Sequence, residues 1–555
     1  MKKIVIGIIL FALTNELKAQ TEPFTKRTVV SGLNSAWEVL YGPNDSLWVT
    51  ENSAYLISRI SVATGAKTVL VNLRATDASI NFLQGDPFPP QGGLMGLAIH
   101  PNLYSADPFV RAAKPWVYAA YVFNKGSCPG TNTSCIYTTK IVRFTYDGNT
   151  LSSPVTIINT IPGSSDHNSG RLVFSPVIEP GADAAHTQYR LYYTVGDMGA
   201  GQFLNTTRTE NAQNMDVMEG KVLRLNSESD GDAGQDAWIP DDNPFFDGTP
   251  ITPKDYVFTL GHRNAQGLVW GNVSGNNILY STEQMDRTDD EINIIEAGKN
   301  YGWDQVSGYC EGNVNGFKIG QNTSANEQAF CSATPSHKEP IFTTFTEIAA
   351  NMAALYAQSN NAFWPTIASS SIDFYGQNQI PGWNYSLLVS PLKHNKVYRV
   401  KLNASGSGIT GDTISYFRGD GNRIRRIRIG PTGTKFYVAR DASAPINGGA
   451  IMEYTYTGVI LSLNDNPGER PARVKDLISI YPNPTADILY VHGKKELRKP
   501  LLVQIYDIYG RMLKEETSFR NDFPVDVSFF RPGTYLLKLY NGFDMEVQIE
   551  KFIKK

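Results

Sequence analysis

GPNDSLWVTENSAYLISRI, residues 42–60, is one unit of a pattern that runs through most of the chain. A Gly-Pro-Asn turn leads into an apolar strand at Leu47–Val49 and then into a second strand, where Arg59 lies between Ser58 and Ile60. Similar units recur near residues 100–144, 175–225, 267–293, 387–400 and 430–454. Several strands per unit, repeated about six times, predict an all-β, six-bladed β-propeller. Two β-sandwiches in series would need a linker in the middle of the chain, and none is visible there.

The composition narrows the possible partners. The chain has 555 residues, and 50 Lys and Arg stand against 53 Asp and Glu, so its formal net charge is −3. A chain this close to neutral lacks the basic field that drives phosphate binding, so we expect no nucleic acid partner.

The N-terminus predicts export. Lys2 and Lys3 precede an apolar run at residues 4–13 that is too short to span a bilayer, and Ala19 offers a cleavage site. Residues 1–20 are therefore predicted to be a secretory signal peptide.

In an oxidising compartment the four cysteines are expected to pair as Cys128–Cys135 and Cys310–Cys331. Metal ligation is the alternative, but neither a CxxC nor a Cys/His spacing supports it.

A second domain is predicted after a polar, Pro-rich linker at residues 457–475, which ends the propeller at 27–456. Residues 476–555 contain short β-like runs between Gly and Pro turns, which predict a small β-sandwich. Its opening YPNP (481–484) and its late GTYLL (533–537) resemble the C-terminal sorting domains of type IX secretion. The resemblance implies export to the outside or to the cell surface through that machinery. A carbohydrate-binding or adhesive sandwich is the alternative.

One histidine lies in a setting that suits a general base. His167 lies in the loop Ser165–Leu172, and the following strand region ends at Asp197. A carboxylate beside a loop histidine fixes the tautomer of the imidazole, as a general base requires. A loop histidine that is merely solvated is the alternative.

Two further polar segments suit an anion and a hard cation. Gly261–Gly267 places Arg263 and Asn264 between strands, as donors for a planar anionic ligand, although an exposed turn is the alternative. Glu283–Glu291 is rich in the oxygen ligands that calcium prefers. It lacks the EF-hand spacing, so a solvated acidic loop is the alternative.

The segment Arg423–Ile429 alternates as a strand. Simple alternation puts Arg423 and Arg425 on the face of Ile427 and Ile429, from which they would project into the mouth of a propeller channel. Arg426 and Arg428 are expected to be surface charges.

The order of these motifs resembles the soluble PQQ-dependent glucose dehydrogenases and the related aldose sugar dehydrogenases. The resemblance covers roughly residues 30–456 and rests on SSDHNSGRLV, YTVGD, GKVLRLN, TLGHRNAQGL and DDEINIIEAGKNYGW, together with Lys393, Arg423 and Arg425. It implies a six-bladed propeller with pyrroloquinoline quinone (PQQ) across the channel mouth. It also implies His167 as the base, Asp197 as its orienting group and Arg263 as the group that stabilises charge on the quinone oxygen. The implied cofactor-binding positions are Gln91, Asp166, Gln202, Asn264, Gln284, Thr366, Lys393, Arg423 and Arg425.

The resemblance also implies calcium. The cofactor's ion would be bound partly by the backbone carbonyls of Met285 and Asp286, where the family usually has Gly-Pro. A second calcium region, associated with a homodimer, maps onto Glu291, Tyr301, Ser307, Tyr309 and Glu311. Trp364 resembles the aromatic wall of the sugar pocket, but Asn361 replaces a family aromatic, so the sugar preference does not transfer.

The expected function is that of a secreted quinoprotein that oxidises an aldose at C1 to the lactone and passes electrons to an unidentified acceptor. A non-enzymatic propeller that binds glycans or proteins is one alternative. A calcium-dependent lactonase is the other.

Overall fold

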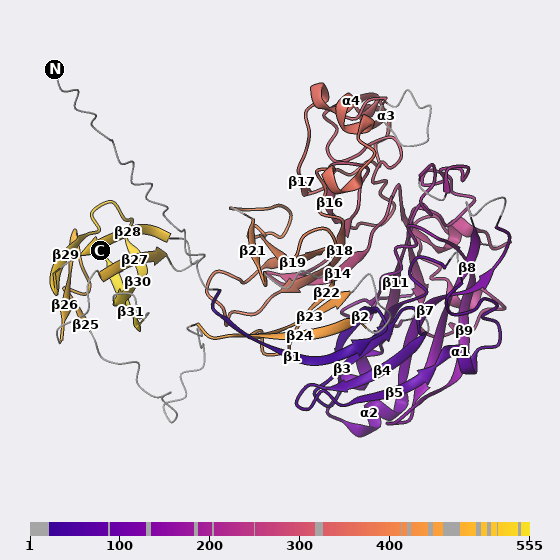
Figure 1. Ribbon diagram of the computed structural model, residues 1–555, viewed down its shortest axis with the longest axis horizontal. Coiled ribbons are helices and arrows are strands. Elements are labelled where there is room, and N and C mark those ends of the chain that lie inside the picture. Colours follow the sequence, from indigo (N-terminus) through magenta and orange to yellow (C-terminus); the bar gives the residue numbers. More distant parts are fainter. Residues whose placement is uncertain are drawn as a thin grey trace, which may run out of the picture.

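The computed structural model contains two groups of antiparallel sheets (Figure 1). The residues that it describes are 22–86, 89–128, 135–181, 187–202, 205–248, 250–316, 326–411, 413–418, 423–441, 448–458, 478–494, 501–507, 512–518, 520–541 and 546–555. The predicted signal peptide and all but the first two residues of the predicted linker lie outside the described residues.

Six four-stranded sheets account for the strands up to residue 456. The first three sheets are β2 (Ala36–Gly42), β3 (Ser46–Glu51), β4 (Leu56–Ser61) and β5 (Lys67–Asn72); β6 (Leu94–Ile99), β7 (Trp116–Lys125), β8 (Ile136–Tyr146) and β9 (Leu151–Ser164); and β10 (Leu172–Phe174), β11 (Arg190–Val195), β12 (Lys221–Asn226) and β13 (Val257–Leu260). The next two are β14 (Gly267–Val273), β15 (Asn276–Glu283), β16 (Asp290–Ile294) and β17 (Phe342–Thr344); and β18 (Ser369–Tyr375), β19 (Ser386–Pro391), β20 (Val397–Lys401) and β21 (Ile414–Tyr416). The last combines β22 (Arg423–Ile429), β23 (Lys435–Asp441) and β24 (Gly449–Tyr456) with β1 (Phe24–Leu33).

Helices are few and short. They are α1 (Leu73–Thr76), α2 (Pro108–Ala113), α3 (Glu327–Ala333) and α4 (Ala349–Ala357), and 3₁₀ turns lie at Pro101–Tyr104, Asp236–Trp238, Pro253–Tyr256 and Asn361–Phe363. None of the helices in the described part of the chain has the length and apolar character needed to span a membrane. The predicted all-β class is confirmed.

Local chemistry explains the hairpins. The turn between β2 and β3 pairs Gly42 with Ser46 and places Asn44 and Asp45 at φ 60° and 52°. Asn and Asp tolerate this left-handed conformation better than other residues with a side chain, so Pro-Asn-Asp favours a tight hairpin at this point.

Hydrophobic cores lie between consecutive sheets. Each of five buried clusters combines residues from one sheet and the next, and a sixth joins the last sheet to the first through Tyr437, Ala439 and Ile451 against Val39 and Leu47. Burial of these faces is the main source of stability for such an arrangement.

The last sheet is completed by the first strand. β1 pairs antiparallel with β24, so the indigo and orange strands lie side by side (Figure 1). Arg27 reinforces the pair with two hydrogen bonds to the Glu453 carboxylate, at 2.9 and 2.7 Å.

The prediction of which side chains of Arg423–Ile429 share a face of the strand was wrong. The pairing of β22 with β23 is irregular between Ile424 and Arg426, which shifts the alternation by one residue. Ile424, Ile427 and Ile429 therefore share one buried cluster, and Arg426 is 2% exposed in an ion pair with Glu38. Arg426 is thus a core residue and not the expected surface charge.

The C-terminal strands form two further sheets. One contains β25 (Ile478–Tyr481), β26 (Ile488–Gly493) and β29 (Asp522–Asp526), and the other β27 (Leu501–Asp507), β28 (Met512–Ser518), β30 (Gly533–Asn541) and β31 (Glu546–Lys554). Both contribute to one buried core, which includes Leu489 and Val491 from the first sheet and Val503, Leu537 and Phe552 from the second.

The expected cysteine pairs are both present. Cys128 is bonded to Cys135, and Cys310 is bonded to Cys331. The second disulfide connects α3 to the loop that follows β16.

Candidate active site

His167 and Asp197 meet as predicted. His167 lies in the loop after β9 with φ 49°, and Asp197 follows β11. The two side chains are buried, and His167 Nδ1 lies 2.7 Å from Asp197 Oδ1. Burial alone would raise the pKa of Asp197, but His167, Arg263 and the Gly199 amide outweigh it and hold that pKa below its usual range. Asp197 is therefore an anionic partner for the imidazole.

Gln202 joins the imidazole to Arg263. Its Oε1 accepts from Arg263 Nη2 at 2.7 Å, which leaves the amide nitrogen to face His167 Nε2, also at 2.7 Å. An amide nitrogen only donates, so His167 Nε2 is the acceptor and Nδ1 carries the proton that faces Asp197. The network thus selects the tautomer whose lone pair is on Nε2, where it accepts from Gln202.

Amide side chains surround the His167 imidazole. Gln91 Nε2 donates to Asp166 Oδ1 at 2.7 Å, and Asn264 Nδ2 donates to Gln284 Oε1 at 3.0 Å. Gln202 Nε2 also donates to Asp166 Oδ2 at 3.3 Å, and Arg263 Nη1 donates to the Gln284 carbonyl at 3.1 Å, so the Gln202–Arg263 bond connects the two pairs. The predicted cofactor positions Gln91, Asp166, Gln202, Asn264 and Gln284 therefore belong to one polar network with His167, Asp197 and Arg263.

A second group of predicted residues contains Lys393. Its ammonium donates to the Trp364 carbonyl at 2.5 Å and to Thr366 Oγ1 at 3.1 Å. Burial lowers the pKa of Lys393, against the attraction of Asp290. The Trp364 ring lies 4.4 Å from the guanidinium of Arg287, which covers one of its faces.

The two arginines of β22 differ in their bonding. Arg425 donates to Gln266 Oε1 at 2.8 Å and lies 3.5 Å from Asp441, and burial lowers its pKa. Arg423 Nε is buried and has no hydrogen-bond partner within the described part of the chain. Arg423 is thus a cation with donor capacity left for a ligand.

The predicted carbonyl ligands lie beside Arg263. Its Nη1 donates to the Met285 carbonyl at 2.9 Å and to the Gln284 carbonyl at 3.1 Å. Asp286 is fully buried, accepts from the Tyr356 hydroxyl at 2.9 Å and lies 3.9 Å from Arg263 Nη2. Carbonyl and carboxylate oxygens therefore gather around the guanidinium of Arg263. Oxygens of these two kinds are also the ligands that calcium prefers.

The second predicted metal region contains more acidic residues than the sequence prediction included. Glu291 accepts from the Gly308 amide at 2.8 Å, and burial with nearby Glu283 raises its pKa well above the usual value. Burial also raises the pKa of Asp289 to about 7 and that of Glu327 to about 7. The Ser307 amide donates to Glu327 Oε1 at 3.3 Å, which brings α3 into the group.

Several oxygen atoms of this acidic group lack partners. Among the described residues, these buried atoms without a hydrogen bond are Asp289 Oδ2, Ser307 Oγ, Asn313 Oδ1 and Glu327 Oε2. Unpaired buried oxygens are costly unless an ion or water satisfies them. Glu311 accepts from Asn313 Nδ2 at 2.9 Å, and burial raises the pKa of both Glu311 and Tyr309.

Tyr301 differs from the other residues of the second predicted calcium region, because its hydroxyl is hydrogen-bonded within the fold. Its hydroxyl donates to the Ile294 carbonyl and accepts from the Glu296 amide at 3.0 Å, while its ring stacks on His262 with centroids 4.6 Å apart. The side-chain oxygen of Tyr301 is therefore already used within the fold.

Compact groups of residues that could bind a metal ion lie outside the two predicted calcium regions. In the described ranges, two sets of three residues have ligand atoms within 4.8 Å of one another: Cys310, Cys331 and His337, and Asp230, Asp232 and Asp241. The first contains a disulfide, and neither includes a predicted calcium residue.

The sequence prediction missed two residues that hold the site together. Trp303 Nε1 donates to Asp197 Oδ2 at 3.0 Å. Asp290 Oδ2 accepts from the Ile367 and Ala368 amides at 2.8 and 2.7 Å, and its Oδ1 accepts from the Met285 amide at 3.0 Å. Trp303 ends the motif NYGW and Asp290 begins β16, but neither position carries a local signal of its tertiary partner.

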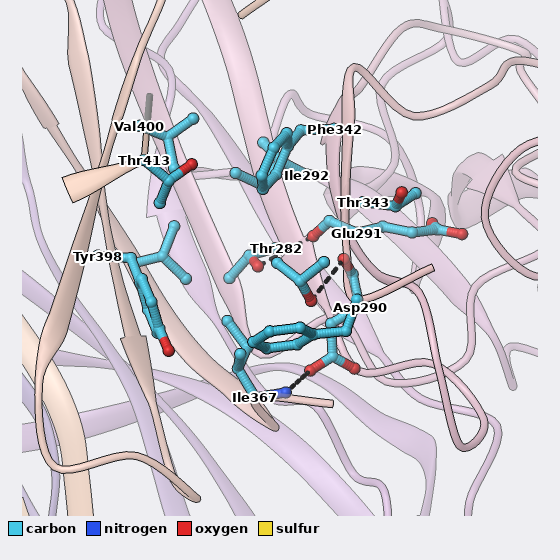
Figure 2. A pocket seen from close by; sticks show the side chains of 13 residues that line it. Thr282, Asp290, Glu291, Ile292, Phe342, Thr343, Ile367, Tyr398, Val400 and Thr413 are labelled. Atoms are coloured by element: carbon cyan, nitrogen blue, oxygen red, sulfur yellow. Dashed lines mark hydrogen bonds between the residues drawn. The ribbon is translucent and has the colours of Figure 1, made fainter. Parts of the chain in front are cut away.

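A cavity of about 200 Å³ lies between β15–β17 and β19–β20, and His167 is not among the residues that line it. Figure 2 shows Asp290 at its edge, bonded to the Ile367 amide, with Ile292, Phe342 and Val400 among its mostly apolar lining. It shares only Asp290 and Glu291 with the site residues described above.

Comparisons with known proteins agree with these motifs. Residues 33–346 and 342–447 match the Glucose / Sorbosone dehydrogenase family, and residues 479–555 match the Secretion system C-terminal sorting domain. The chain is 30% identical over 487 residues to Quinoprotein glucose dehydrogenase B of Acinetobacter calcoaceticus, which covers 79% of this chain and 92% of that protein.

Solved structures show the same fold. The PQQ-bound aldose sugar dehydrogenase of Streptomyces coelicolor is similar with a TM-score of 0.50 and 23% identity, over 78% of this chain and 98% of that one. The apo-form soluble aldose sugar dehydrogenase of Escherichia coli is similar with a TM-score of 0.53 and 21% identity, over 78% of this chain and 99% of that one.

Proposed function

Because this chain belongs to the glucose/sorbosone dehydrogenase family, we propose that it is a quinoprotein that oxidises an aldose at C1 to the lactone. Its C-terminal sorting domain directs it out of the cell or to the cell surface through the type IX system. In this proposal the six sheets are the blades of a propeller, and the two C-terminal sheets form a β-sandwich.

The observation that carries the proposal is the continuous chain Asp197–His167–Gln202–Arg263. The Nε2 lone pair of His167 would accept the proton of the sugar's anomeric hydroxyl once Gln202 gives way to substrate. Asp197 would stabilise the imidazolium that results. Loss of that proton and of the C1 hydride leaves the C1=O bond of the lactone.

Arg263 would stabilise negative charge that develops opposite the base. It is buried, and its guanidinium is held by Gln202 and by the carbonyls of Gln284 and Met285. A preorganised cation in a dry site needs little reorganisation during reaction, which is how such groups lower a barrier.

The residues present fit PQQ. Arg423 has donor capacity left, and Lys393 and Arg425 add two further cations for a ligand with three carboxylates. Gln91, Asp166, Asn264, Gln284 and Thr366 would hold its polar edges. Bound PQQ would supply the two-electron acceptor for the hydride, with calcium as a Lewis acid.

The residues present also fit calcium. The carbonyls of Met285 and Asp286, with the buried Asp286 carboxylate, would hold one ion. Glu291, Ser307, Tyr309, Glu311 and the Tyr301 carbonyl would hold a second, and the unpaired oxygens of Asp289 and Glu327 support that assignment. The homodimer associated with the second ion stays a prediction.

Dye-linked oxidation of an aldose panel, with and without added PQQ and calcium, tests the proposal. We expect PQQ-dependent turnover that falls at least about a hundredfold in His167→Ala, because the base is lost. His492→Ala, in the C-terminal sheets, is the matched control and should keep full activity. Absence of both quinone binding and turnover in wild type would favour a glycan-binding propeller, and quinone-independent lactone hydrolysis would favour a lactonase.

A further inference from the structure

We infer that Trp303 is a positioning residue that fixes the orientation of Asp197 and couples the His167 base to Arg263. The inference rests on the proposed function, because it assigns Trp303 a part in the same proton transfer. Neither the family match nor the motif NYGW assigns this role.

Each carboxylate oxygen of Asp197 has a different task. Oδ1 faces His167 Nδ1 at 2.7 Å and also accepts from the Gly199 amide at 2.8 Å. Oδ2 accepts from the Trp303 indole at 3.0 Å. The indole N–H therefore prevents the carboxylate from rotating away from the imidazole.

The indole ring also borders the cation. The guanidinium of Arg263 lies 5.3 Å from the centre of the ring, within the range of a cation–π contact. The ring packs with Ala212 and Met285 in one small buried cluster. Trp303 thus contacts the carboxylate behind the base, the opposing cation and the residue whose carbonyl Arg263 binds.

Trp303 is itself firmly anchored. Its amide donates to the Gly261 carbonyl at 3.0 Å, and its carbonyl accepts from Gln213 Nε2 at 2.6 Å. Gln213 is in turn bonded to Asn300 in both directions, at 3.0 and 2.7 Å. A side chain held at both backbone groups can impose its geometry on a neighbour.

A second carboxylate shares the indole N–H. Glu210 Oε2 lies 3.2 Å from Trp303 Nε1, while its Oε1 accepts from the Asn211 and Ala212 amides. Burial and the charge of Asp197 raise the pKa of Glu210 well above its usual value. Two carboxylates face His167 directly: Asp197, and Asp166 with an oxygen 3.9 Å from Nε2. Arg263 reaches the imidazole through Gln202, and Glu210 lies on the far side of the indole.

Trp303→Phe tests the inference, because it keeps a ring and removes the donor. Without the indole N–H, the charge of Asp197 is less stabilised and favours the protonated imidazole more strongly. We expect the acid limb of kcat/KM to move up by about one pH unit and its plateau to fall about tenfold or more.

Trp48→Phe is the matched control. Trp48 is fully buried in the first sheet, and its Nε1 has no hydrogen-bond partner in the described residues. The substitution removes the same atoms without removing a hydrogen bond, so it should lower stability while the acid limb stays in place. An unmoved limb in Trp303→Phe would reduce Trp303 to a packing residue and overturn the inference.

A measurement on the wild-type fold covers the case in which Trp303→Phe does not fold. The chain has eight tryptophans, so ¹⁵N-indole labelling gives at most eight Nε1–H signals. One signal should titrate with the midpoint of the kinetic acid limb and should lose that titration in His167→Ala. If no indole signal does so, the inference is wrong.

The same spectra separate the inference from the proposed function. If wild type shows no dehydrogenase turnover, the proposed function fails. An indole signal assigned to Trp303 that titrates in wild type and not in His167→Ala would still establish the coupling of Trp303 to the His167–Asp197 pair.

Discussion

The Glu38 carboxylate lies between two buried guanidinium groups. Its Oε1 accepts from Arg426 Nε at 2.7 Å, and its Oε2 is bonded to Arg171 Nη1. All three residues are at most 2% exposed. Burial alone would raise the pKa of Glu38, but the two arginines outweigh it and hold that pKa below its usual range.

We expect Glu38→Gln to be strongly destabilising. The substitution leaves two buried cations with no opposing charge, which should lower the free energy of unfolding by about 3–5 kcal/mol. Urea unfolding at pH 7 measures the loss. Glu296→Gln is the control, since Glu296 is 46% exposed and its pair with Lys338 should contribute about 1 kcal/mol or less. Equal losses in the two variants would contradict the assigned role of the Glu38 group.

Sequence motifs predicted the cluster of His167, Asp197 and Arg263, but not the residues that hold these side chains in place. The motifs that contain His167, Asp197 and Arg263 are rich in polar residues, so these side chains were expected to lie together. In the structure they do lie together. Trp303 and Asp290 act through a bond to a backbone or side chain more than fifty residues away. Such a partner depends on the packing of complete sheets, which residue type and spacing do not specify.

At the scale of elements, Asp77 ties α1 to the second sheet. It follows the last residue of α1, and its Oδ2 accepts from the Tyr121 hydroxyl in β7 at 2.6 Å. Lys140 in β8 forms an ion pair with the same oxygen at 2.5 Å. Burial opposes ionisation, but Lys140, Ser79 and Tyr121 together lower the pKa of Asp77 to about 2.

This carboxylate predicts a pH dependence on the acid side. Because its pKa is lower in the folded state than in the unfolded state, its contribution to stability is fully present above about pH 4. The contribution is lost as the pH falls through about 2. Asp77→Asn should therefore flatten the fall in unfolding midpoint between pH 4 and pH 2, measured in urea. The exposed Asp216 provides the control substitution, Asp216→Asn, and the same flattening in both variants would refute the assignment.

Elements with regular alternation were predictable, and the irregular ones were not. The tight turn at Asn44 and Asp45 has a sequence signature. The irregularity between Ile424 and Arg426 has none, because an extra residue in a strand is tolerated wherever neighbouring sheets accommodate it. The error about Arg426 follows from that single residue.

At the scale of the whole molecule, β1 joins the beginning of the first group of sheets to its end. Its residue Leu33 is fully buried, and Val29 is nearly so, in the core between the last and first sheets. Without β1, the edge of β24 would expose unpaired backbone groups and an apolar surface.

We expect a protein that lacks residues 22–33 to lose cooperative unfolding and to aggregate. Size-exclusion chromatography and thermal unfolding measure the two effects, with a protein that begins at residue 22 as the control. A truncated protein that stays monomeric and unfolds at the control's midpoint would show that the β1–β24 pairing contributes little.

The pairing of β1 with β24 also determines when β1 can join its sheet during synthesis of the chain. Arg27 and its partner Glu453 are 426 residues apart, so β1 cannot pair until β24, the last strand of the six sheets, has been made. At a ribosomal rate of roughly 5–20 residues per second, that delay is about 20 to 85 s. The five sheets made of β2 to β21 have all their strands before β24 is made, while the sheet that contains β1 does not. The nascent chain therefore carries β1 without its sheet partner for most of its synthesis. Its dependence on chaperones should be greatest in that interval and should fall once β24 has been made.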